Sequence, residues 1–171
     1  GGLCNDAIAG ANRQGGQRND VIDVVFEHAV HDCTPAPVKK VLVSGSIAWD
    51  RPFRTYVFEL EDERLEKLQH PGYWNKYEKG APEVVKEKWF QVLNRYLCAF
   101  CDAHSLRYIH LRVFEIASVG ALLLADRLVE KEMNELGFID GETCIFCDGS
   151  DFLEKVSWIL DDANRKAVDK I

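Results

Sequence analysis

The segment that begins at Ser44 carries side chains suited to binding an anionic ligand. Ser44-Gly45-Ser46 offers hydroxyl groups and backbone amides directly after a short apolar run, and Arg51 and Arg54 follow closely in the chain. A strand-to-helix turn of this kind can hold a phosphate, to which guanidinium groups add charge. The segment has neither the lysine of a Walker A motif nor the three glycines of a dinucleotide fingerprint. Taken alone, it is better explained as an ordinary tight turn.

Glu115 and His70 are two further candidates by residue type and position. Glu115 interrupts an apolar stretch at 113–117, so its carboxylate either faces solvent or accepts hydrogen bonds from a diol such as a ribose. By spacing alone the solvated alternative is the simpler one. His70 stands before Pro71-Gly72 and could act as a general base or donate to a phosphate, because histidine titrates near neutral pH. An isolated loop histidine more often does neither. No metal-ligand spacing is present at His28, His31, His104 or His110.

Two Cys-x-x-Cys pairs, Cys98/Cys101 and Cys144/Cys147, raise the question of a zinc site. The residues between the cysteines are strand formers, and residues three apart on a strand point to opposite faces. Zinc knuckles usually need a tight turn to bring their sulfur atoms together. We therefore expect buried core thiols and no bound metal at these positions.

Alternating strands and helices must position these residues. Apolar runs predict strands at 41–43, 65–70, 97–101, 121–125 and 143–147. Helical spacing and start or stop signals predict helices at 52–60, 82–96, 112–119, which Gly120 ends, and 128–136, and a last helix capped by Ser150. This order predicts an α/β, Rossmann-like open parallel sheet with helices on both faces. In such sheets, ligands bind outside the carboxyl ends of the strands.

Composition and charge limit the function classes. The 171 residues suit one folded domain, which we place at 38–171. Residues 1–37 are expected to form an N-terminal tail and linker, or the remnant of a preceding domain, and the first 20 of them are rich in Gly, Asn, Gln and Arg. The net charge of −7 excludes a general nucleic-acid binder. No apolar run is long enough to span a bilayer, so no transmembrane segment is expected. Six cysteines are too sparse for a disulfide scaffold and predict reduced thiols in a cytoplasmic protein.

Several segments together resemble one family, in the same order along the chain. The stretch 111–126, LRVFEIASVGALLLAD, resembles the donor-site segment of GT-B glycosyltransferases, especially the spore-maturation-protein-like group. The continuation 135–142, ELGFIDGE, and the helix that includes Leu153 follow as in that group. Upstream, 41–46 with Arg54, and then His70-Pro71-Gly72-Tyr73, look like its landmarks. The resemblance covers about residues 39–171.

The resemblance implies a C-terminal, donor-binding domain, which is one half of a GT-B fold and holds a nucleoside-diphosphate sugar without a metal ion or another cofactor. Glu115 would bind the ribose hydroxyls, Arg54 and Arg112 would bind the diphosphate, and His70 would contact the phosphate or the sugar as the catalytic candidate. Small residues would let the helix approach the ligand closely. The further candidate ligand-binding residues are Gly45, Ser46, Tyr73, Ser118 and Gly120.

The chain departs from the family pattern in two ways. Many retaining members carry a second glutamate eight positions before the ribose-binding one, where this chain has Arg107, so the stereochemical outcome stays open. A GT-B enzyme also has two Rossmann-like domains, and this sequence has length for one. The acceptor-binding half is therefore expected outside this sequence or on another polypeptide, or it has been lost. The last case would leave a non-catalytic domain that binds a nucleotide sugar. A response-regulator-like domain is a third alternative, but Ser44-Gly45-Ser46 lacks the acidic residues that it requires.

Overall fold

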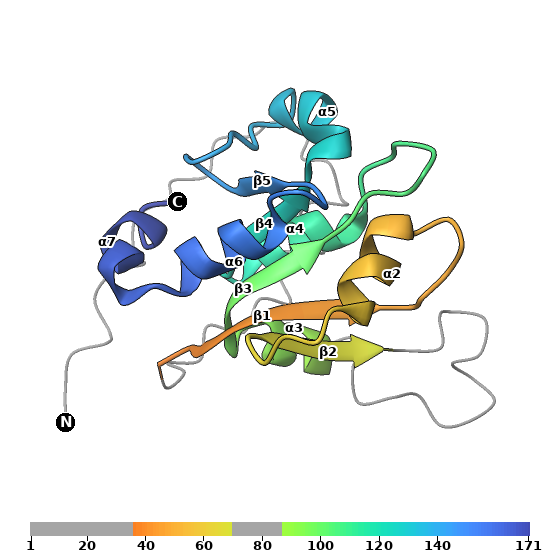
Figure 1. Ribbon diagram of the computed structural model, residues 1–171. Helices are drawn as coiled ribbons and strands as arrows, with labels where there is room; N and C mark the ends of the chain where they lie inside the picture. Colours follow the sequence, from red (N-terminus) through yellow and green to blue (C-terminus); the bar gives the residue numbers. More distant parts are fainter. Residues whose placement is uncertain (1–35, 70–86) are drawn as a thin grey trace.

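A five-stranded parallel sheet forms the centre of the domain (Figure 1). The computed structural model describes residues 36–69 and 87–171, so all but the last two residues of the predicted tail at 1–37, and the candidates His70 and Tyr73, lie outside the described residues. The strands stand in the order β2-β1-β3-β4-β5. Their bounds are β1 (Val38–Gly45), β2 (Leu65–Gln69), β3 (Tyr96–Cys101), β4 (Leu122–Asp126) and β5 (Ile145–Cys147).

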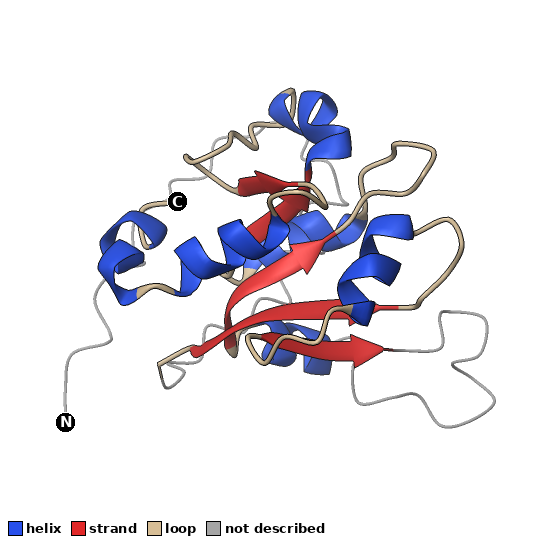
Figure 2. Ribbon diagram, viewed as in Figure 1, coloured by secondary structure: helices blue, strands red, loops and turns tan. Residues whose placement is uncertain are grey.

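Helices cover both faces of the sheet, which confirms the α/β Rossmann-like class (Figure 2). They are α2 (Pro52–Glu59), α3 (Glu87–Leu93), α4 (Leu111–Ser118), α5 (Glu130–Asn134), α6 (Phe152–Leu160) and α7 (Arg165–Val168), with single 3-10 turns at Arg127–Val129 and Asp162–Asn164. Residues of α2, α6 and α7 pack on one face, and residues of α3, α4 and α5 pack on the other. The strands between them are buried on both sides, as their continuous apolar runs indicate.

Aromatic contacts join α2 and α6 to the central strand. The rings of Phe53, Phe100 and Phe152 meet edge to face, with centroids 5.0, 5.2 and 5.8 Å apart. Phe100 and Phe152 are almost completely buried. Each such side chain contributes about 1.5–3 kcal/mol by leaving water. This packing fixes α2, and therefore the arginine that α2 carries, against the end of the sheet.

The cysteines occupy opposite faces of the sheet, as the strand spacing predicts. Cys98 and Cys147 belong to the core on one face, and Cys101 and Cys144 belong to the core on the other. All four are free thiols. Burial raises the pKa of each thiol, so the sulfur atoms stay protonated at neutral pH and serve packing.

Two predicted boundaries are wrong for clear structural reasons. Tyr96 was expected at the end of a helix, but that helix ends at Leu93 and Tyr96 already pairs with Val38 in the sheet. The last strand begins at Ile145, because Thr143 belongs to a turn in which its hydroxyl binds Ile139 N and Gly137 O.

The predicted cap of the last helix is also wrong. Asp151 is the residue before α6. The neighbouring Ser150 hydroxyl donates to Asp148 over 2.6 Å, so it serves the turn and leaves the helix uncapped. The single helix predicted at 128–136 is a 3-10 turn followed by the short α5.

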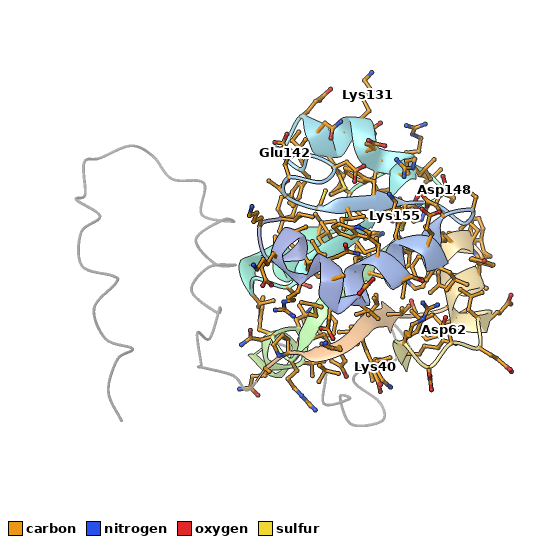
Figure 3. The ribbon with its side chains drawn as sticks, turned by 60° about the vertical axis from the view of Figure 1, so that its left-hand side comes forward. Lys40, Asp62, Lys131, Glu142, Asp148 and Lys155 are labelled. Carbon is orange, nitrogen blue, oxygen red and sulfur yellow. The ribbon has the colours of Figure 1, made fainter. Side chains whose placement is uncertain are left out.

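Charged side chains surround the outside of the domain. Lys131 and Glu142, both exposed, lie at the end of the molecule away from Lys40 (Figure 3). Within the described ranges, none of the helices combines the length and the apolar character that crossing a membrane requires.

Candidate functional site

The order in which the chain adds strands to the sheet reverses direction between β1 and β3. The chain leaves β1 through α2 toward β2 on one side, and it leaves β3 through α4 toward β4 on the other. Both loops leave the same edge of the sheet (Figure 1). A crevice between two such diverging loops is where open α/β sheets bind ligands. The residues at the ends of β1 and β3 are therefore the first place to look for chemistry.

Two guanidinium groups meet over Gly45 at the end of β1. Gly45 is buried and has φ +130°, a conformation that L side chains rarely adopt. A Cβ atom built on it would lie 2.8 Å from Cζ of Arg54 and 2.9 Å from Nη1 of Arg112. Arg54 belongs to α2 and Arg112 to α4, so one guanidinium group from each face of the sheet lies next to Gly45. Absence of a side chain at Gly45 is what makes this convergence possible.

Arg54 forms a buried ion pair with Asp102, the residue that follows β3. Its Nη2 donates to Oδ1 of Asp102, and its Nη1 donates to Ser46 O over 3.4 Å. The side chains are 8% and 0% exposed. Burial raises the pKa of Asp102, although Arg54 acts in the opposite direction. Asp102 Oδ2 is buried with no hydrogen-bond partner within the described part of the chain, so one acceptor remains at the centre of the site.

Arg112 and Glu115 both contact Trp89 of α3. The Arg112 guanidinium lies 5.1 Å from the centre of the Trp89 ring and donates to Ser44 O over 2.6 Å. Trp89 Nε1 donates to Oε2 of Glu115 over 2.8 Å. Glu115 is half-buried. The carboxylate thus stands one helical turn from Arg112, near the edge at which the strands end, and a carboxylate has accepting capacity beyond one such bond.

Ser118 and Gly120 lie at the other end of α4, away from the arginines. The Ser118 hydroxyl donates to Glu115 O of its own helix, and Gly120 ends the helix with φ +71°. Gly120 borders a cavity of about 410 Å³ near the amino ends of β3 and β4, with Tyr96 and Leu122 in the lining. The structure therefore brings together Gly45, Ser46, Arg54, Arg112 and Glu115 from the predicted set, and it leaves Ser118 and Gly120 apart from them.

Sequence reasoning missed several residues that shape this edge. Asp50 accepts from His104 over 2.7 Å, and Asp50 O accepts from Ser105 N, so the loops after β1 and β3 are tied together. Asp126, at the end of β4, accepts from Ala103 N over 3.1 Å. The available signal was an acidic residue immediately after each of the strands predicted at 97–101 and 121–125. For Trp89 the sequence gave no signal of a role in the site beyond its position on a buried helix face.

His110 is a further missed residue, at the start of α4. Its Nε2 contacts Nη1 of Arg51, and its ring meets the Tyr108 ring edge to face at 5.2 Å. Guanidinium is always a donor, so Nε2 accepts and the imidazole is neutral. Burial, followed by the charges of Arg51, Arg54 and Arg112, lowers the pKa of His110 to about 4. The only signal in the sequence was a histidine two residues before the helix predicted at 112–119.

The stability of the domain should depend on pH through His110. Its pKa lies at about 4 in the folded state and near 6.5 in an unfolded chain, so the unfolded state binds more protons between these values. The free energy of unfolding should therefore fall as the pH is lowered from 6.5 to 4. Urea unfolding of the wild type and of His110→Gln across this range measures the contribution. If the free energy of unfolding changed with pH equally in the two proteins, His110 would not be the cause of this pH dependence.

Two remaining predictions concern metal ligands and Arg107. Within residues 36–69 and 87–171, no group of three or more His, Cys, Asp or Glu side chains could hold a metal ion. Arg107, which the resemblance aligns with the second glutamate of many retaining members, is exposed, has φ +58° and forms an ion pair with Glu132 at 3.5 Å. It faces the α5 side of the loop.

Comparison with known proteins adds one finding. Residues 36–170 match the family described as glycosyl transferase-like. Neither the curated proteins nor the solved structures give a significant match. The matched range includes all five strands and the whole cluster around Gly45. The chain therefore belongs to the glycosyl transferase-like family.

Proposed function

We propose that this chain is the donor-binding domain of a metal-independent GT-B glycosyltransferase. It would hold a nucleoside-diphosphate sugar from which a sugar is transferred to an acceptor. The observation that carries the proposal is the convergence of Arg54 and Arg112 on Gly45 at the point where the sheet reverses its winding. Two guanidinium groups at one point suit a diphosphate, whose charge increases as the glycosidic bond breaks.

Glu115 supports the nucleoside half of the proposal. It lies one helical turn beyond Arg112, and Trp89 fixes its orientation through one carboxylate oxygen. A ribose whose diphosphate lies on Arg112 would then bring its hydroxyl groups toward this carboxylate. The arginines supply the positive charge that a diphosphate leaving group requires, in place of a metal ion.

The Glu115 contact can be tested by its preference for ribose. Glu115→Gln keeps an oxygen that can accept from Trp89 but removes the charge, so we expect about tenfold weaker nucleotide binding. Wild-type protein should bind UDP or GDP more tightly than the corresponding 2′-deoxynucleotide, and Glu115→Gln should lose this preference. Isothermal titration calorimetry measures all four affinities.

A matched control separates the contact from the loss of charge in general. Glu154 on α6 is exposed and lies outside the site, so Glu154→Gln should bind as the wild type does. No binding of UDP, GDP or their sugars to the wild type would overturn the proposal. Binding without turnover of the donor, with or without candidate acceptors, would identify a non-catalytic nucleotide-sugar-binding domain.

A further inference from the structure

His110 stands among three guanidinium groups without carrying a charge itself. Arg51, at the start of α2, occupies Nε2 of the imidazole. Arg54 on α2 and Arg112 on α4 lie near enough to act on the ring electrostatically, as does His104 in the loop after β3. Burial first, and then the charges of these neighbours, keep the imidazole in its unprotonated form.

Two carboxylates in the loops that carry Arg51 and His110 already have a cationic or histidine partner. Asp102 is paired with Arg54, and Asp50 is paired with His104. Arg51 contacts His110 and Tyr108, and no carboxylate lies within 4.0 Å of it among the residues that the structure describes. Arg51 therefore brings to this edge of the sheet a guanidinium charge that no described carboxylate contacts directly and that an anion would compensate.

We propose that His110 takes up a proton when a diphosphate binds at Gly45, and that His110 and Arg51 then both donate hydrogen bonds to it. This inference rests on the proposed function of the site. The negative charge of the ligand offsets the guanidinium groups, and Arg51 turns from Nε2 of His110 to a phosphate oxygen. Nε2 then accepts a proton from solvent and donates it in a hydrogen bond, and no covalent bond to the ligand forms or breaks.

In the unliganded protein, His110 is unprotonated near pH 6 and can therefore take up a proton when the ligand binds. Because the pKa of His110 is about 4 in the unliganded structure, the imidazole enters the binding reaction without its proton. A bound diphosphate would offset the part of this shift that the guanidinium charges cause, and would so raise the pKa of His110 toward the ordinary value of histidine. Diphosphate affinity should therefore increase as the pH falls from about 7 to about 5, which spans the titration of an ordinary histidine.

Proton uptake can be measured directly with inorganic pyrophosphate, which needs no knowledge of the base or the sugar. Calorimetric titrations near pH 6 in buffers of different ionisation enthalpy give the number of protons taken up per ligand. The wild type should take up roughly 0.5 to 1 proton more than His110→Gln, because pyrophosphate's own ionisation is common to both. Arg165→Gln removes a guanidinium from α7, near the cavity at the amino ends of the strands, and should match the wild type.

A second variant keeps the test independent of the folding of His110→Gln. Arg51→Gln removes a cation from the imidazole, so its His110 should titrate at a higher pH in the free protein and take up less of a proton on binding. Nuclear magnetic resonance of the His110 ring follows this titration. Pyrophosphate binding with equal proton uptake in the wild type and both variants would overturn the inference and leave the proposed function standing. Failure of both nucleotides and pyrophosphate to bind would overturn both.

Discussion

Replacing Arg54 with alanine is expected to lower the free energy of unfolding by about 3–5 kcal/mol, because Asp102 would remain buried without its cation. The Asp102 side chain is 0% exposed, and its Oδ2 has no hydrogen-bond partner in the described part of the structure. Loss of Arg54 would leave the other oxygen without its guanidinium partner. Urea unfolding followed by circular dichroism measures the change.

A second substitution distinguishes this cause from a general packing loss. In the Arg54→Ala background, Asp102→Asn removes the buried charge and should recover a large part of the lost stability. If the loss came from packing, the second substitution would lower the stability further. Arg54→Ala with wild-type stability would contradict the buried ion pair. For measuring diphosphate binding, Arg54→Lys is the better variant, since it keeps the positive charge and loses only the two-pronged geometry of guanidinium.

The ion pair also shows how far the sequence could predict this site. Arg54 was a candidate because of its residue type and its place after a predicted strand, and Arg112 because of the resemblance to the donor-site segment. Their meeting over Gly45 depends on α2 and α4 covering opposite faces. Asp102 was only the first residue of a predicted loop, and its pairing with Arg54 spans 48 positions. Local periodicity carries no information about such a contact, which exists only once the sheet order is fixed.

The elements themselves were easier to predict than their ends. Apolar runs such as 121–125 located the strands, because a strand buried on both faces must be continuously apolar. Tyr96 was assigned to the preceding helix since it continues the helical spacing of Trp89 and Leu93. Its pairing with Val38 in the sheet decided the outcome, and tertiary contacts of this kind override local spacing.

Gly45→Ala is expected to damage both stability and binding. Alanine would have to adopt the φ of +130° that Gly45 has, which costs about 1–3 kcal/mol for a non-glycine residue. It would also overlap the guanidinium groups of Arg54 and Arg112. Arginine ends usually move away at low cost, but Arg54 is held by the buried Asp102. Displacing it would weaken the ion pair, so the expected loss of stability exceeds the backbone strain alone, and nucleotide affinity should fall more than tenfold.

Gly141→Ala is the matched control, because it separates backbone strain from the loss of the anion site. Gly141 has φ +73°, but a Cβ there would meet nothing within 4 Å. This variant should lose stability through strain alone and keep the nucleotide affinity of the wild type. Urea unfolding and calorimetric titration of both variants give the comparison. If Gly45→Ala bound nucleotide as tightly as Gly141→Ala, the two guanidinium groups over Gly45 would not be the place where the diphosphate lies.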